Sequence, residues 1–215
     1  MRHRFFDLAF TPSVRTEQAR RGSRAAYASA VAEAGDDAAG ERLTERELSF
    51  IADRDSFYLA SVSETGWPYV QHRGGPAGFV RRGDDGTLGW SEFAGNRRYV
   101  SQGNLAADDR VAMIFVDYPN RRRLKVLGRL RKVLGRLRMV EPGDAPELAE
   151  RFGVGAYRAR TERLAVVTVE AFDWNCPQHI TPRFTVAEIE AAVAPLHARI
   201  AELEAQAAAR EAMPA

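Results

Sequence analysis

Residues 57–79, FYLASVSETGWPYVQHRGGPAGF, hold the clearest structural pattern in the chain. The aromatic and β-branched content of 57–62 predicts a strand, and 67–72 predicts the strand that returns beside it. Glu64-Thr65-Gly66 supplies the tight turn between them, and Gly74-Gly75-Pro76 ends the pairing. The stretch therefore predicts an antiparallel hairpin.

Short strand patterns continue along the middle of the chain. Turn residues, rather than long helical crossovers, separate most of these patterns, so the sheet they form is expected to be mainly antiparallel. This class of protein is mainly β, with a barrel or a sandwich as its architecture. The further predicted strands are 79–82, 87–91, 111–116, 122–140 and 165–172.

Helical patterns flank the predicted sheet. Thr44-Glu45-Arg46-Glu47 has the spacing of a capping box, which predicts a helix that ends near Asp53. The other predicted helices are 14–33 with a break at Gly22, 95–105, and 185–212. These patterns divide the chain into an N-terminal helical extension (1–43), a β domain (44–184) and a C-terminal helix (185–215).

Apolar residues in the C-terminal helix recur at spacings of four, three, four and three, which is the a/d seam of a coiled coil. The seam either packs on the protein's own β domain or contacts a second copy, and the sequence leaves both open. Pro195 lies inside the pattern and weakens an autonomous coiled coil. The seam consists of Ile189, Val193, Leu196, Ile200 and Leu203.

A tandem copy interrupts the strand predicted over 122–140. Residues 125–131, KVLGRLR, are repeated without change at 132–138. Side chains in a strand alternate with a period of two, so an insertion of seven residues turns the second copy to the opposite face. The repeat therefore predicts a bulge, a loop or a register break near Arg131-Lys132.

Composition restricts the class of protein. The chain has 215 residues and a net charge of +2, which suits a globular domain with a proper core. No apolar run is long enough to span a bilayer. The single cysteine, Cys176, excludes an internal disulfide, so a reducing cytoplasm is the expected compartment.

Four segments carry side chains suited to an anionic or flat ligand. In Gln71–Pro76 an arginine leads into two glycines that allow close backbone approach, and Trp90–Arg98 offers Ser91, Asn96 and two arginines at a predicted helix start. Each has a plainer interpretation, as a strand exit or as a capped helix with a solvated basic turn. The other two segments are Asp117–Leu124, with three arginines, and Trp174–Phe184, which is rich in proline.

Several other chemistries are not expected. The chain lacks the G-x-S-x-G, G-x-G-x-x-G and Walker patterns. Cys176 and His179 have no second close pair of ligands, so no metal site is predicted. Nucleic-acid binding is disfavoured because the arginine-rich strand lacks interleaved aromatic residues.

Residues 57–79, a Trp-Ser pair at Trp90-Ser91, and 95–131 (GNRRYVSQGNLAADDRVAMIFVDYPNRRRLKVLGRLR) together resemble the FMN-binding split-barrel family related to pyridoxamine 5′-phosphate oxidase. The segment FDWNCPQHITPRF, residues 172–184, resembles the closing signature of a flavin-nucleotide-binding branch. The resemblance implies an antiparallel six-stranded split β-barrel, and a homodimer with FMN held at its interface.

The resemblance also implies which residues hold FMN. Gln71, His72, Arg73 and Gly74 would run beside the isoalloxazine and ribityl chain, with Arg73 reaching the phosphate. Trp90 and Ser91 would line the ribityl and phosphate region, where Asn96 also lies. Arg97 and Arg98 match the basic pair that grips the phosphate. Arg123, Trp174 and Gln178 would approach from the partner chain or from the closing loop.

These implications predict an oxidoreductase that transfers a hydride between a small molecule and FMN. The alternative is a non-catalytic carrier of flavin or haem on the same barrel. No residue is assigned a catalytic role.

Overall fold

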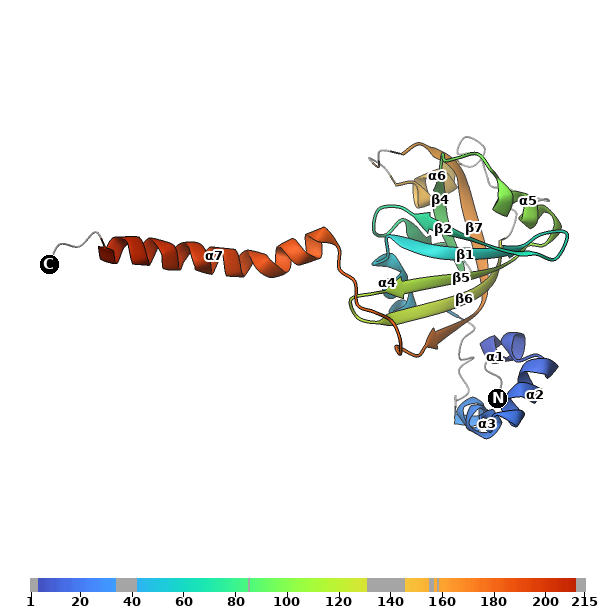
Figure 1. Ribbon diagram of the computed structural model, residues 1–215. Helices are drawn as coiled ribbons and strands as arrows, with labels where there is room; N and C mark the ends of the chain where they lie inside the picture. The colour runs from blue at the N-terminus through green and yellow to red at the C-terminus, as the bar shows by residue number, and fades with distance from the viewer. Residues whose placement is uncertain are drawn as a thin grey trace. The chain divides into compact units, whose positions relative to one another are not determined.

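The computed structural model describes residues 4–33, 42–84, 86–130, 146–154, 157 and 159–211 (Figure 1). The chain forms two compact units. The first contains Met1–Asp117 and Arg122–Pro177, and the second contains Tyr118–Arg121 and Gln178–Ala215. The first unit holds the sheet and helices α1 to α6, and the second holds helix α7.

Three short helices open the first unit: α1 (Arg4–Ala9), α2 (Pro12–Arg20) and α3 (Arg24–Glu33). The predicted break at Gly22 is confirmed, since Gly22 separates α2 from α3 with a φ of 77°, a conformation that glycine adopts at little cost. The ring of Phe10 packs on Phe6 at 4.5 Å and on Tyr27 at 5.3 Å, which joins α1 to α3. Phe5 is buried, and α1 packs along strand β7.

Helix α4 (Glu45–Ala52) confirms the predicted capping box. The Thr44 side chain accepts a hydrogen bond from the backbone N–H of Arg46, and Glu47 accepts the backbone N–H of Thr44 at 3.0 Å. Phe50 and Ile51 point from this helix into the core. The helix thus begins at a fixed residue and buries one apolar face.

The seven strands of the described residues lie in one antiparallel sheet with the order β2-β1-β5-β6-β7-β4-β3, which confirms the mainly β class. The resemblance implied six strands, but each of the seven segments predicted as a strand overlaps one of those observed. The shortest is β3, three residues long, which pairs with β4 in the second predicted hairpin. The strands are β1 (Ser56–Val62), β2 (Pro68–Gly74), β3 (Val80–Arg82), β4 (Thr87–Phe93), β5 (Arg110–Asp117), β6 (Arg122–Leu130) and β7 (Thr161–Asn175).

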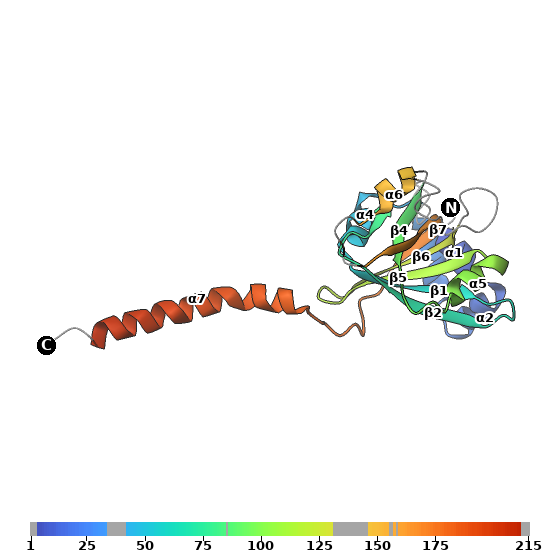
Figure 2. The same ribbon diagram turned by 90° about the horizontal axis from the view of Figure 1, so that it is seen from above.

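Strand β7 makes the sheet curl (Figure 2). Its 15 residues pair with β4 through the first half and with β6 through the second half, so it joins the two parts of the barrel. The register of β6 on β7 shifts between Leu127 and Gly128. A Cβ at Gly128 would lie 2.5 Å from the carbonyl oxygen of Thr168, so only glycine fits this close approach.

Aromatic rings fill the interior of the curled sheet. Phe57 on β1 contacts Phe79 at 5.9 Å, Trp90 at 5.2 Å and Phe115 at 5.0 Å between ring centroids. Helix α6 (Pro146–Phe152), which the sequence did not predict, packs on β3 and β4 and buries Phe152 outside the cluster that holds these rings. A Cβ at Gly89 would meet the Phe152 ring at 2.4 Å, so glycine makes room for that ring.

The predicted C-terminal helix is confirmed as α7 (Val186–Glu211), and Thr185 and Glu188 form hydrogen bonds of the capping-box type at its start. Most of the predicted seam is exposed, from 47% at Leu203 to 62% at Leu196. The second copy of the tandem repeat and the break predicted near Arg131-Lys132 lie outside the described residues.

Candidate functional site

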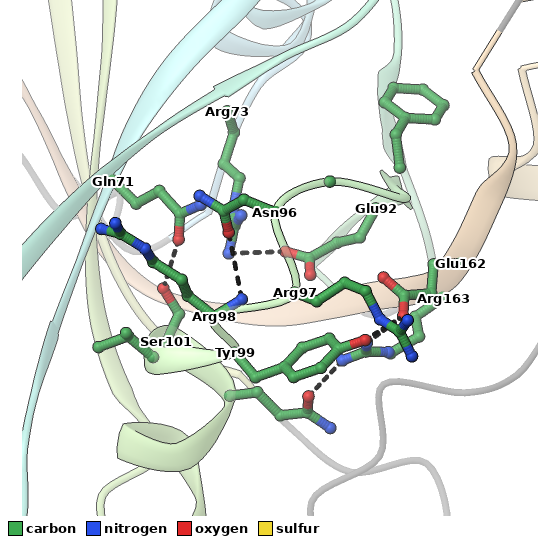
Figure 3. Close-up of a pocket in the computed structure, with 14 residues that line it drawn as sticks. Gln71, Arg73, Glu92, Asn96, Arg97, Arg98, Tyr99, Ser101, Glu162 and Arg163 are labelled. Carbon is green, nitrogen blue, oxygen red and sulfur yellow. Dashed lines mark hydrogen bonds and ion pairs between the residues drawn. The ribbon is translucent and has the colours of Figure 1, made fainter.

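A polar pocket of about 260 Å³ lies where β2, the end of β4, the start of β7 and helix α5 (Val100–Ala107) meet (Figure 3). We call it the arginine pocket. The structure brings five of the predicted residues together there: Gln71, Arg73, Asn96, Arg97 and Arg98. Its other polar lining residues are Glu92, Tyr99, Ser101, Gln102, Glu162 and Arg163.

The loop before α5 shapes this pocket. The helix predicted over 95–105 is wrong at its start, because α5 begins only at Val100. Asn96 accepts a hydrogen bond from the backbone N–H of Arg98 at 3.1 Å, and Arg97 and Tyr99 both have left-handed backbone conformations, with φ of 60° and 54°. Side-chain bonding of this kind competes with helix formation, so 95–99 forms a loop.

Helix α5 presents its N-terminus to the pocket without a side-chain cap, because Tyr99 at the N-cap makes no such hydrogen bond. The first amide groups of a helix favour anions. Two hydrogen bonds fix the helix on the sheet: Ser101 donates to Gln71 on β2 at 3.1 Å, and Asn104 donates to Ser61 on β1 at 3.1 Å. The amide end of α5 and the side chain of Gln71 are therefore held in place together.

Glu92 and Arg73 face each other across the inner wall, 3.0 Å apart. Burial raises the pKa of Glu92, and the charges of Arg73 and Arg163 only partly oppose this effect. The Nε atom of Arg73 is buried and has no hydrogen-bond partner among the described residues. Arg73 therefore has an N–H that no described residue uses.

Tyr99, Glu162 and Arg163 form the opposite wall. The Tyr99 hydroxyl donates to Glu162 at 2.8 Å, and Arg163 lies 2.7 Å from the same carboxylate. The hydrogen bond from Tyr99, followed by that from Arg163, lowers the pKa of Glu162. The Arg163 guanidinium also stacks over the Tyr99 ring, 4.5 Å from its centroid, and donates to Gln102.

The pocket remains cationic after these pairings. Four arginines and two glutamates line it, which gives a formal charge of +2. Arg97 and Arg98 are exposed, and Arg98 takes part in no ion pair within the part of the chain that the structure describes. The arrangement can therefore bind an anion of two charges at a helix N-terminus.

A smaller hollow of about 150 Å³ adjoins the arginine pocket and shares Arg73, Glu92 and Phe93 with it. The predicted residues His72, Gly74, Trp90 and Ser91 line it. Trp90 is almost wholly buried in the core, and Ser91 donates to the Phe152 carbonyl oxygen at 3.0 Å. The polar group of Ser91 is therefore already bonded inside the protein.

Trp174, another predicted site residue, belongs to neither hollow. Its indole N–H donates to Glu47 of α4 at 2.7 Å, and its ring meets Phe50 edge-on at 4.7 Å. The guanidinium groups of Arg46 and Arg122 lie over the same ring, at 4.8 and 4.9 Å from its centroid. We call these five residues the Trp174 cluster.

Arg123 and Gln178 are not among the residues that line the arginine pocket. Arg123 pairs on β6 with Val116 of β5 and Asn175 of β7, and its buried Nε has no hydrogen-bond partner among the described residues. Gln178 belongs to the second compact unit. A role in cofactor binding for Arg123, Trp174 and Gln178 stays a prediction, as does their approach from a partner chain or from the closing loop.

Sequence reasoning missed Glu92, Tyr99, Glu162 and Arg163 as pocket residues. Glu92 pairs with Arg163 across β4 and β7, although the two are far apart in the chain. For Glu162 and Arg163 the sequence does hold a signal. They are a charged pair that directly precedes the apolar run 164–167, and charged residues in a buried strand rarely lack a partner.

The chain belongs to the pyridoxamine 5′-phosphate oxidase family. The sequence model of that family matches residues 43–175, which include all seven strands and every residue of the arginine pocket. The resemblance stated from the sequence is thus confirmed at the level of the family.

Solved structures with similar folds include HupZ of Group A Streptococcus, which is 16% identical; the match covers 66% of this chain and 100% of HupZ, with a TM-score of 0.42. An FMN-binding protein of Syntrophomonas wolfei is 13% identical over 61% of this chain and 88% of its own, with a TM-score of 0.41. HutZ, the heme storage protein of Vibrio cholerae, is 16% identical over 61% and 94%, with a TM-score of 0.37. A search of curated proteins gave no match.

Two further features concern the described ranges alone. None of their helices has both the length and the apolar character needed to cross a membrane. No three or more His, Cys, Asp or Glu side chains come together there in a group that could hold a metal ion.

Proposed function

We propose that this protein binds FMN, with the phosphate in the arginine pocket, and acts as an FMN-dependent oxidoreductase on a small molecule. One observation carries the proposal: in a chain of this family, four arginines and two glutamates surround an uncapped helix N-terminus. A phosphate monoester carries about −1.5 to −2 charges at pH 7, which matches the pocket's formal charge of +2.

The residues present fit the phosphate and the chain attached to it. Arg98 and the first amide groups of α5 are suited to the phosphate oxygens, because neither is used in an ion pair or a side-chain cap among the described residues. The unpartnered Nε of Arg73 supplies a donor deeper in the same pocket. Gln71, held by Ser101, offers an oriented amide beside it.

Bound FMN would supply the hydride chemistry. The chain's own residues bind and orient it: Arg97 and Arg98 at the rim, and Arg73, paired with Glu92, at the inner wall.

We further propose that the FMN site is completed by a second copy of the chain. The arginine pocket of about 260 Å³ is smaller than the roughly 300–1,000 Å³ of pockets that enclose whole ligands. On the outer face of β1 and β2, Tyr58, Val62 and Val70 are exposed, from 37% to 60%. An exposed apolar sheet face of this kind is typical of an interface.

A carrier of flavin or haem is the second candidate function. The observation that favours it is His72, which is exposed on β2 with its ring 5.5 Å from that of Tyr58, since histidine is the commonest protein ligand of haem iron. In either case we propose a cytoplasmic location, because the single cysteine, Cys176, is exposed and forms no disulfide within the chain.

The test is the visible spectrum of the purified protein, with mass spectrometry of any released ligand and titration of the ligand-free protein with FMN. A flavin spectrum, or saturable FMN binding, is the expected result. Reduction of the bound flavin by a nicotinamide or deazaflavin donor, followed by its reoxidation, would distinguish an oxidoreductase from a carrier. A colourless protein that does not bind added FMN contradicts the proposal, and a haem spectrum replaces it with the second candidate.

A further inference from the structure

Helix α7 carries a continuous apolar stripe that no other described residue of its own compact unit covers. Five of its six large apolar side chains are exposed by about half or more, and the sixth, Val193, is partly buried. A stripe of this length on one helix face marks an interaction site in soluble proteins. The exposures are 72% at Val186, 51% at Ile189, 62% at Leu196, 52% at Ile200 and 47% at Leu203.

The stripe follows a heptad pattern over three repeats. The a positions are Val186, Val193 and Ile200, all β-branched, and the d positions are Ile189, Leu196 and Leu203. β-Branched residues at a with leucine at most d positions favour parallel two-stranded coiled coils. Val186 adds the residue that extends the seam from two heptads to three.

Two features of α7 are compatible with such pairing. Pro195 falls at position c of its heptad, on the side of the helix away from the seam. The hydrogen bonds between Thr185 and Glu188 fix the first turn directly before the first a position. The proline therefore removes one backbone hydrogen bond without entering the contact surface.

We propose that α7 pairs with α7 of a second copy as a parallel, in-register coiled coil. The charges beside the seam favour this occupant. In a parallel pair, Arg199 at position g faces Glu204 at position e of the other helix, and symmetry forms this opposite-charge contact twice. An antiparallel pair that buries the same six residues sets Arg199 opposite Ala192 instead, so both contacts are lost.

Among the charged residues beside the seam, Arg199 and Glu204 thus meet opposite charges on an identical helix. Within its own helix Arg199 also bonds Glu202, at position c. The proposal concerns α7 alone and does not depend on whether the protein binds FMN. It also differs from the interface proposed at the outer face of β1 and β2, because the two surfaces belong to different compact units.

The test is disulfide cross-linking of the full chain in a Cys176→Ser background. Ala207 follows Leu203 at the next a position, so Ala207→Cys places two thiols across the seam of a parallel pair. Ala205→Cys, at the outward f position of the same exposed turn, is the matched control. In the antiparallel alignment the two residues 207 would lie roughly 37 Å apart, at 1.5 Å per residue.

Under mild oxidation, Ala207→Cys should form interchain disulfides roughly a hundredfold faster than Ala205→Cys. The seam holds the two 207 thiols within bonding distance, at an effective concentration near millimolar, whereas the outward 205 thiols of one pair point apart and react only between separate molecules at micromolar concentration. Leu196→Glu added to Ala207→Cys should remove this advantage, which separates pairing of α7 from proximity caused by another interface. Equal rates for the two cysteines, or cross-linking unaffected by Leu196→Glu, would overturn the proposal.

Discussion

The arginine pocket and the Trp174 cluster are built from the same kinds of side chain, and only the pocket leaves a space among them. Both combine arginines, a buried or partly buried glutamate and an aromatic ring. In the Trp174 cluster the rings and arginines stack on one another, and Glu47 bonds the indole and the start of α4. In the pocket, Arg98 and the Nε of Arg73 lack such partners among the described residues.

The difference comes from the backbone that carries the side chains. In the cluster, α4 begins with a capping box that places the Glu47 carboxylate directly against the indole of Trp174. In the pocket, the loop over 95–99 holds two residues in left-handed conformations and leaves α5 uncapped. An arginine-rich segment can therefore bind an anion only where the backbone places no carboxylate or other acceptor against its guanidinium groups.

The largest expected effect is on ligand binding at the pocket. Arg97→Ala combined with Arg98→Ala should weaken FMN binding about a hundredfold or more, because charge-assisted hydrogen bonds contribute about 1.5–3 kcal/mol each. Thermal stability should hardly change, since both side chains are exposed. Titration of the ligand-free variant measures the effect. Arg110→Ala, an exposed arginine outside the pocket, is the control and should bind FMN normally.

The Trp174 cluster should respond in the opposite way. Trp174→Phe keeps a ring against Phe50 but removes the donor to Glu47, so the free energy of unfolding should fall by about 1–2 kcal/mol. FMN affinity should stay within about twofold, because the indole N–H is already used inside the chain. Chemical denaturation and FMN titration measure the two quantities, and Trp67→Phe, at a 74% exposed position, is the stability control. A large loss of affinity with normal stability would instead place Trp174 in the FMN site.

An effect on FMN affinity is also expected at Glu92, inside the arginine pocket. Glu92→Gln removes a carboxylate from the phosphate site and should tighten FMN binding about fivefold, as expected for roughly 1 kcal/mol of screened repulsion over several ångströms. The pKa of Glu92 is raised by burial, so wild-type Glu92 becomes neutral as the pH falls. The advantage of the variant should therefore grow as the pH rises through that pKa.

The ratio of the two affinities across pH is the measurement, since it cancels the ionisation of the phosphate itself. A ratio that is constant with pH, or a variant that binds FMN more weakly, would show that Glu92 does not oppose the phosphate.

The smallest effect is expected on the stability of the fold, at Glu47 of the Trp174 cluster. Burial opposes ionisation of Glu47, but hydrogen bonds from Thr44 and Trp174 outweigh it and lower its pKa. A carboxylate with a lowered pKa adds stability above its unfolded pKa of about 4.3, and that stability is lost as the pH falls through the folded value. Wild type should therefore exceed Glu47→Gln in stability at neutral pH, with the difference shrinking in acid. Denaturant unfolding at several pH values tests this sign.

Most of the fold could be predicted from local patterns. The hairpin over 57–79, the Thr44 capping box and the C-terminal helix all depend on residues close in sequence, and the structure has them. The sequence predicts a start for α5 five residues before the observed one, because the bond between Asn96 and Arg98 replaces the first helical turn. The segment predicted as a strand over 79–82 contains β3, so the second hairpin is also a local pattern.

The candidate site could be predicted only in part. The segment around Arg97 and Arg98 is basic in its local sequence, and this composition alone predicts an anion site there. Glu162 and Arg163 reach the pocket only because β7 pairs with β4, a long-range contact that no local pattern specifies. A role for Trp174 in ligand binding stays a prediction, and its hydrogen bond to Glu47 is another long-range contact that no local pattern specifies.

If the arginine pocket holds the phosphate of a flavin nucleotide, the ligand-free protein must distinguish FMN from riboflavin, which has the same ring and ribityl chain without the phosphate. Titration with the two ligands compares their affinities directly. We expect FMN to bind about a hundredfold more tightly, and Arg97→Ala with Arg98→Ala to reduce FMN binding to the level of riboflavin. Equal affinity of the wild-type protein for the two ligands would contradict this expectation.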